Sequence, residues 1–226
     1  MNRIRVVQAC LDKVQNRTYL EIGVSTGSCF SKIRASTKYA VDPEFKIPER
    51  RRRDTEKLAD KTSYFEVTSD AFFASNRGLL ESSRIGVALV DGLHTYKQSL
   101  HDVLNILPYL DDDGFIVMHD CRPRFASEAR PAANHGEFMR TGKWWEIAWT
   151  GDVWKAVVEL RATRSDLRVA VLDCDCGVGI IRRGKPDDML ALKPEAIAAM
   201  TYQDLVKDKQ HLLNLRKPDY FWSFLL

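Results

Sequence analysis

TYLEIGVSTGS, residues 18–28, runs from apolar residues around an acid straight into a turn with two glycines four positions apart. The apolar run is typical of a buried strand. Gly23 and Gly27 would let a ligand or another segment come very close to the backbone. In open parallel sheets the first strand usually ends in such a turn, and the ligand lies beyond the carboxyl ends of the strands. The stretch therefore predicts the first strand of a parallel sheet with a binding turn at its end.

Short apolar segments continue along the chain and alternate with helical patterns. This alternation predicts an α/β fold, a Rossmann-like doubly wound sheet of seven strands that is mostly parallel and closes with an antiparallel C-terminal hairpin. The six further strands are expected at KYAVD (38–42), SYFEV (63–67), IGVALVD (85–91), GFIVMHD (114–120), LRVAVLD (167–173) and GVGIIRR (177–183).

The helical pattern is clearest over residues 96–107. One apolar stripe is expected to face the sheet and a polar face to lie outward. The stripe consists of Leu100, Val103, Leu104 and Leu107, and the outward residues are Lys97, Gln98 and Asp102. An amphipathic opening helix and a helix over residues 152–162 are also expected.

Length and composition favour one globular domain over residues 1–226, because 45% of the residues are hydrophobic and 29% are charged. Within it we expect a ligand-binding core at 17–121, a lid or substrate loop at 121–150, and a C-terminal helix with an apolar tail at 185–226. The tail should cover the core or pack on another subunit in a homo-oligomer.

Charge and targeting signals are weak. A net charge of +3 is too small to indicate a nucleic-acid partner, and we interpret Arg50–Arg53 as a solvated helix start rather than a phosphate or membrane contact. The N-terminal segment has neither a long apolar run nor a small-residue cleavage site, so a cytoplasmic protein without a membrane partner is expected.

The five cysteines are expected to be reduced, since an odd number leaves one unpaired in any full disulfide scheme. Cys174 and Cys176 in DCDC could suggest a metal. No second pair of ligands at zinc spacing follows, which favours structural thiols on one face of a strand.

The acid at position 21 helps to identify the ligand of the glycine turn. A dinucleotide would require G-x-G-x-x-G, and a pyrophosphate would be repelled by Glu21. A ligand with an amino group and a sulfonium cation would be attracted, and Asp42 at the end of the second strand could accept hydrogen bonds from ribose hydroxyls. The pattern thus favours S-adenosylmethionine, with a purely structural turn as the alternative. The predicted cofactor contacts are Glu21, Gly23, Ser25, Gly27, Asp42, Ser69, Asp70 and Asp91.

A second group of residues follows the fourth and fifth strands. Asp91, His119 and Asp120 should project at neighbouring strand ends, where two carboxylates and an imidazole could bind Mg²⁺ or another divalent ion. His94 could then accept a proton from an attacking hydroxyl, because an unperturbed imidazole has a pKa of about 6.5. The alternative is that these residues cap turns or helices, as Asp70 also could.

The segments YLEIGVSTGS, YAVDPEF, VDGLHTY and GFIVMHDC resemble those of class I S-adenosylmethionine-dependent methyltransferases. The resemblance is to the branch with macrocin and mycinamicin sugar O-methyltransferases and proteins called cephalosporin hydroxylases. It implies methyl transfer to a small-molecule hydroxyl, Mg²⁺ at Asp91 and at the acidic pair after the fifth strand, and His94 as general base. His119 stands where that branch has glutamate, which shifts the preference toward Mn²⁺, Zn²⁺ or Fe²⁺.

Four tryptophans could shape an acceptor pocket beside the lid or pack in the core: Trp144, Trp145, Trp149 and Trp154. Two other functional classes stay open. A nicotinamide-dependent oxidoreductase would share the fold but lacks the glycine spacing. A non-catalytic interaction protein is suggested only by the apolar tail, Tyr220–Leu226.

Overall fold

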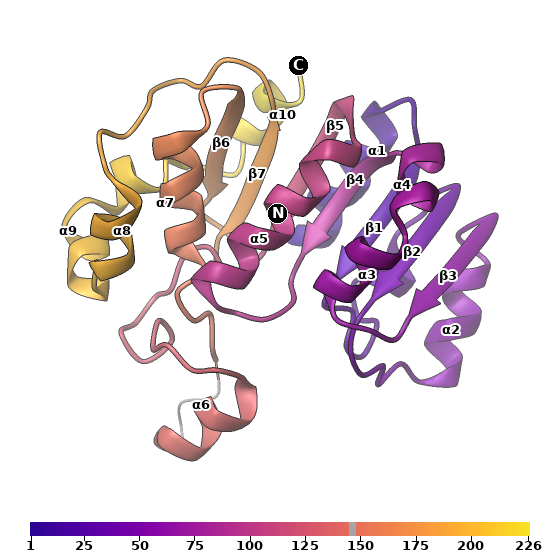
Figure 1. The fold of residues 1–226 in the computed structure, drawn as a ribbon, viewed down its shortest axis with the longest axis horizontal. Helices are drawn as coiled ribbons and strands as arrows, with labels where there is room; N and C mark the ends of the chain where they lie inside the picture. The colour runs from indigo at the N-terminus through magenta and orange to yellow at the C-terminus, as the bar shows by residue number, and fades with distance from the viewer. Residues whose placement is uncertain (145–147) are drawn as a thin grey trace. The chain divides into compact units, whose positions relative to one another are not determined.

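The computed structural model describes residues 1–144 and 148–226, and it has an α/β fold (Figure 1). The described residues form eight strands in one sheet, in the order β3-β2-β1-β4-β5-β7-β6-β8. The predicted fold class is confirmed. The chain divides into two compact units: unit 1 holds residues 1–92, 101–117 and Leu225, and unit 2 holds 93–100, 118–224 and Leu226. A single domain over the whole chain stays a prediction.

Unit 1 contains the parallel strands that place the glycine turn. β1 pairs in parallel with both β2 and β4, so that Leu20 lies opposite Tyr39 on one side and Ala88 on the other. The strand order reverses at β1 and β4, which is where ligands bind in such sheets. The bounds are β1 (Thr18–Ile22), β2 (Thr37–Val41), β3 (Lys61–Phe65), β4 (Ile85–Val90) and β5 (Leu110–Met118), the last residue of β5 belonging to unit 2.

The helices of unit 1 begin with α1, which buries Val7 and Leu11 as its amphipathic pattern predicts and contacts β4. The basic run lies in α2. It is less solvated than predicted, because the Arg52 guanidinium lies over the Tyr64 ring, 4.6 Å from its centroid. The bounds are α1 (Arg3–Lys13), η1 (Phe30–Lys32), α2 (Glu49–Glu56), α3 (Ser69–Ser75), α4 (Arg77–Ser83) and η2 (Leu107–Tyr109).

α5 (Tyr96–Ile106) forms where a helix was predicted, but its buried face differs from the expected stripe. Asp102, expected outside, is 1% exposed, whereas Leu104, expected inside, is 38% exposed. The prediction failed because a buried carboxylate breaks the apolar pattern. The Asp102 carboxylate lies beside Gly92. Its Oδ2 is 3.9 Å from the position that a Cβ on Gly92 would occupy.

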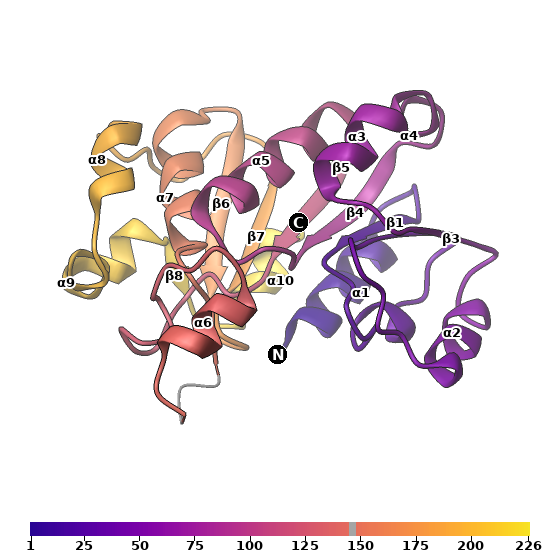
Figure 2. The ribbon, with the colours of Figure 1, turned by 60° about the horizontal axis from the view of Figure 1, so that its bottom comes forward.

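Unit 2 is built around the β6–β7 hairpin, which is antiparallel as predicted, with Val169 opposite Ile181. β8 pairs in parallel with β6 and adds an eighth strand, which its two residues were too few to signal in the sequence. α7 contacts β6 and α8 (Figure 2). The bounds are α6 (His135–Thr141), α7 (Trp154–Thr163), β6 (Leu167–Leu172), β7 (Val178–Arg183), α8 (Pro194–Ala199), α9 (Tyr202–Leu212), β8 (Leu215–Arg216) and α10 (Tyr220–Phe224).

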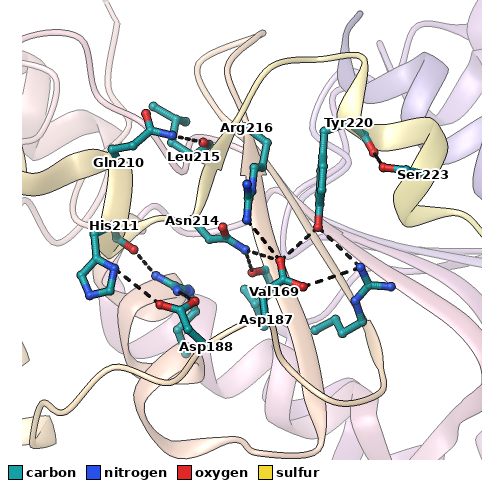
Figure 3. Close-up of polar contacts among 12 residues, drawn as sticks. Val169, Asp187, Asp188, Gln210, His211, Asn214, Leu215, Arg216, Tyr220 and Ser223 are labelled. Carbon is teal, nitrogen blue, oxygen red and sulfur yellow. Dashed lines mark hydrogen bonds and ion pairs between the residues drawn. The ribbon is translucent and has the colours of Figure 1, made fainter.

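The apolar tail forms α10, and two of its aromatic rings are buried in the chain itself. Phe221 is 0% exposed and Phe224 is 1% exposed. Tyr220 donates a hydrogen bond to the Asp187 carboxylate, which also accepts one from Asn214 (Figure 3). The tail therefore covers its own core, and a homo-oligomer through it stays a prediction.

The cysteines, all within the described residues, form no disulfide. Cys174 and Cys176 lie in the turn between β6 and β7 and not on one face of a strand, so that part of the prediction was wrong. Burial raises the pKa of both thiols, which keeps them protonated. No helix in residues 1–144 and 148–226 combines the length and hydrophobicity needed to cross a lipid bilayer.

Candidate active site

The glycine turn after β1 has a left-handed backbone, with φ of 87° at Gly23, 46° at Ser25 and 70° at Gly27. A Cβ at Gly23 would lie 2.1 Å from the carbonyl oxygen of Asp91, at the end of β4. Only glycine fits there, because the turn and the end of β4 are in backbone contact. The structure thus brings the predicted turn to the switch point of the sheet.

Asp42 follows β2 and is 8% exposed. Its Oδ2 accepts a hydrogen bond from the Ser25 backbone at 2.7 Å, and its Oδ1 accepts one from the Glu44 backbone at 2.8 Å. Each carboxylate oxygen has a second lone pair, so Asp42 can fix the turn and still accept ribose hydroxyls. This cradle of glycine backbone and carboxylate fits S-adenosylmethionine.

Glu21 lies on β1 in a buried cluster and is 2% exposed. Burial raises the pKa of Glu21 to about 8, although the hydrogen bond from the Tyr19 hydroxyl, 2.5 Å long, lowers it. Burial also lowers the pKa of nearby Lys38 to about 8. Glu21 therefore belongs to the buried core beside Tyr19, and its direct contact with a cofactor stays a prediction.

Ser69 and Asp70 occupy the first turn of α3. The N-cap of this helix is Thr68, whose hydroxyl accepts from the Ala71 backbone at 3.3 Å, so Asp70 is not the cap. The Asp70 carboxylate instead lies 3.2 Å from Nδ1 of His101. The adenine contact predicted for Ser69 and Asp70 remains a prediction.

Asp91 follows β4 and forms an ion pair with Arg3, whose Nε lies 3.3 Å from its carboxylate. Arg3 was not predicted as a site residue, because nothing in the sequence of α1 indicates that its first residue reaches a strand end.

His94 lies in unit 2 and has a defined tautomer. Its Nδ1 is 2.7 Å from the carbonyl oxygen of Trp149, which can only accept a hydrogen bond, so Nδ1 carries the proton of the neutral ring. The Nε2 lone pair then faces Oδ2 of Asp120 at 3.3 Å. A proton accepted at Nε2 would be stabilised by this carboxylate, as a general base requires.

His119 and Asp120 follow β5, and both are buried. His119 Nδ1 lies 3.2 Å from Oδ2 of Asp120, so two imidazole nitrogens, from His94 and His119, converge on one carboxylate oxygen. Neighbouring ligand atoms on an octahedral ion are about 3 Å apart, given metal–oxygen distances near 2.1 Å. His119 and Asp120 could therefore be adjacent ligands of a divalent ion, for which an imidazole favours Mn²⁺, Fe²⁺ or Zn²⁺ over Mg²⁺. The metal site at Asp91, His119 and Asp120 stays a prediction.

The predicted lid contains α6 and a packed aromatic pair. Phe138 stacks on Trp149 with the ring centroids 5.6 Å apart, and Trp149 donates from Nε1 to the Arg130 carbonyl. Trp149 thus organises the loop that holds His94, and Trp154, 1% exposed, is a core residue. Trp144 is 85% exposed, and Trp145 lies outside the described residues.

Comparison with known proteins identifies the domain. Residues 20–121 match a family described as "Methyltransferase domain". This part of the chain, somewhat less than half of it, is similar to a methyltransferase domain. The match spans the glycine turn, Asp42, Asp91 and the residues after β5, and it confirms the predicted resemblance to class I methyltransferases. No curated protein matches the chain in sequence.

Solved structures with a similar fold include several methyltransferases. A protein from Klebsiella pneumoniae assigned as an O-methyltransferase is 12% identical, with a TM-score of 0.54 over 80% of each chain. Cofactor-bound Rv0187 from MTB is 13% identical, with a TM-score of 0.52 over 81% of each chain. These likenesses show the fold alone. The MycE methyltransferase of mycinamycin biosynthesis, in complex with Mg, SAH and mycinamycin VI, is 13% identical, with a TM-score of 0.45 over 80% of this chain and 48% of MycE.

Proposed function

We propose that this methyltransferase transfers a methyl group from S-adenosylmethionine to a hydroxyl group of a small molecule, such as a sugar or a natural product. The observation that carries the proposal is the arrangement of His94: its Nδ1 is held by the Trp149 carbonyl, and its Nε2 lies beside the Asp120 carboxylate. Such a histidine suits removal of a proton from an oxygen nucleophile.

The cofactor, when bound, supplies an electrophilic methyl group on a sulfonium ion. The turn at Gly23 and Gly27 gives backbone access to it, and Asp42 offers acceptors for its ribose. Held there, the cofactor would supply its methyl group to an acceptor oxygen and leave as S-adenosylhomocysteine. Nε2 of His94 would accept the hydroxyl proton, and Asp120 would stabilise the resulting imidazolium.

A divalent ion is the second part of the proposal. His119 and Asp120 would hold it, and Asp91 remains the third predicted ligand. Bound near the acceptor, the ion would lower the pKa of a hydroxyl group and orient it. The imidazole of His119 suggests that Mn²⁺, Fe²⁺ or Zn²⁺ replaces the Mg²⁺ expected from the resemblance.

Two experiments test the function: one measures cofactor binding, and the other searches for the methyl acceptor. Calorimetry should show binding of S-adenosylhomocysteine and not of NAD⁺. A metabolite extract incubated with the enzyme and S-adenosylmethionine should contain species that gain one methyl group. His94→Ala should keep its affinity for S-adenosylhomocysteine and reduce turnover about 10²- to 10⁴-fold, the usual contribution of a general base.

His211→Ala is the matched control, because His211 is an exposed histidine of the same unit that pairs with Asp188. It should leave turnover unchanged. Near-normal turnover of His94→Ala would remove the base from the proposal, and binding of NAD⁺ in place of S-adenosylhomocysteine would overturn the function itself.

A further inference from the structure

The glycine turn contains one strained residue that is not a glycine. Ser25 has a φ of 46°, between Gly23 and Gly27, which adopt left-handed conformations at little cost. A left-handed conformation is unfavourable for a residue with a Cβ, so surrounding contacts have to enforce it. Ser25 and Thr26 are both exposed, so packing of their side chains contributes little. The enforcing contacts must therefore come from hydrogen bonds to the backbone of the turn.

Residues 42–51, which run from the end of β2 into the first turn of α2, make these hydrogen bonds. The Ser25 N–H donates to Oδ2 of Asp42 at 2.7 Å. The Ser25 carbonyl oxygen accepts from the Lys46 backbone N–H at 3.0 Å. Both backbone groups of the strained residue are thus held by this one segment.

Arg51 holds the next peptide group of the turn. Its Nη1 donates to the Thr26 carbonyl oxygen at 2.7 Å, a distance typical of a hydrogen bond from a charged donor. Arg51 itself is fixed in the first turn of α2, where its backbone N–H donates to the Pro48 carbonyl oxygen at 2.8 Å. Because Thr26 lies between the left-handed residues Ser25 and Gly27, holding its carbonyl oxygen sets the orientation of the peptide that joins it to Gly27.

We propose that Arg51 is a positioning residue of the cofactor site, which keeps the glycine turn in its binding conformation by holding the Thr26 carbonyl oxygen. The inference rests on the cofactor of the proposed function. A ligand that binds one conformation binds more weakly in proportion to the fraction of molecules that lack it. Without Arg51, fewer contacts oppose the strain at Ser25, so fewer molecules hold the turn ready for the cofactor.

The test uses S-adenosylhomocysteine as the probe and Arg51→Ala as the variant. Calorimetry should show affinity about 3- to 10-fold weaker, as expected for the net loss of one hydrogen bond. Arg51→Lys should restore part of the affinity, since an ammonium group also donates to a carbonyl oxygen. In a Ser25→Gly background, Arg51→Ala should have a smaller effect, because glycine adopts the left-handed conformation without strain.

Arg53→Ala is the matched control, because Arg53 lies in the same helix but pairs with Glu49 at 3.7 Å, with both side chains largely exposed. It removes the same charge and should leave the affinity unchanged. Unchanged affinity in Arg51→Ala would overturn the proposal. An equal loss with Ser25 and with Gly at position 25 would also overturn it, because Arg51 would then contact the cofactor directly.

A second measurement needs no cofactor. In the unliganded protein, Arg51→Ala should shift the backbone amide signals of residues 25–27 in ¹H–¹⁵N spectra, whereas Arg53→Ala should not. Unshifted signals in Arg51→Ala would overturn the hold of Arg51 on the turn. Shifted signals in a protein that fails to bind S-adenosylhomocysteine would instead be a failure of the proposed function, so the two failures are distinguishable.

Discussion

Glu21 is a buried carboxyl group whose protonation should influence stability. Burial raises its pKa in the folded protein from 4.5 to about 8, against the lowering effect of the Tyr19 hydrogen bond. Between these values the folded state holds a proton that the unfolded state has lost. Stability contributed by the neutral group is therefore complete below about pH 4.5 and decreases as the pH rises toward 8.

Glu21→Gln should flatten this dependence. The melting temperature of the unsubstituted protein should fall between pH 5 and pH 8, whereas that of the variant should fall less. Burial lowers the pKa of Lys38 from 10.5 to about 8, so above pH 8 this group makes stability rise with pH. The effects of Glu21 and Lys38 on stability therefore fall in different pH ranges. Parallel melting curves for both proteins between pH 5 and 8 would show that Glu21 is ionised throughout.

For individual residues, the sequence predicts the acids and glycines at strand ends, but it does not predict which residues contact them. Asp42 and Asp91 directly follow predicted strands, and parallel strands place such residues at one edge. Arg3, which pairs with Asp91, and the Trp149 carbonyl, which faces His94, come from segments far away in the chain.

The elements of the fold were predictable wherever one periodicity dominates. β1, β4 and the β6–β7 hairpin form where their apolar runs predict them. α5 shows the limit of this reasoning, since Asp102 is buried although the pattern assigns it to solvent. β8, with two residues, depends on pairing with β6 and has no pattern of its own.

α10 offers a prediction at the scale of an element, because adjacent aromatic residues differ in burial. Phe221 is 0% exposed, whereas Trp222 is 51% exposed. Phe221→Ala should cost about 3 to 5 kcal/mol of unfolding free energy, the range for emptying a buried aromatic site. Trp222→Ala should change it by less than about 0.5 kcal/mol, as surface substitutions do.

Chemical denaturation measures both free energies, and light scattering on the same samples tests the homo-oligomer. A reduced mass for Trp222→Ala would place this ring in a contact between copies of the chain. Equal destabilisation by the two substitutions would mean that Phe221 is not the buried anchor of α10.

For the whole molecule, the proposed binding residues fall in both units. All predicted cofactor contacts lie in unit 1, among them Asp91, which is also a predicted metal ligand, whereas His94, His119 and Asp120 lie in unit 2. A ligand that binds only the folded state stabilises it by about 2.7 kcal/mol at a concentration of 100 times its Kd. For a chain of this size that corresponds to a rise in melting temperature of about 5 to 10 °C.

Hydrogen exchange should therefore respond to each ligand at its own set of residues. S-adenosylhomocysteine should slow exchange at residues 23–27 and 42–44, and Mn²⁺ should slow it at residues 119–122. Gly23→Ala should abolish the first effect, because its Cβ would lie 2.1 Å from the Asp91 carbonyl oxygen. Gly78→Ala should preserve it, since a Cβ there meets no atom within 4 Å. Protection by S-adenosylhomocysteine that spares residues 23–27, or that survives in Gly23→Ala, would place the cofactor elsewhere than at the glycine turn.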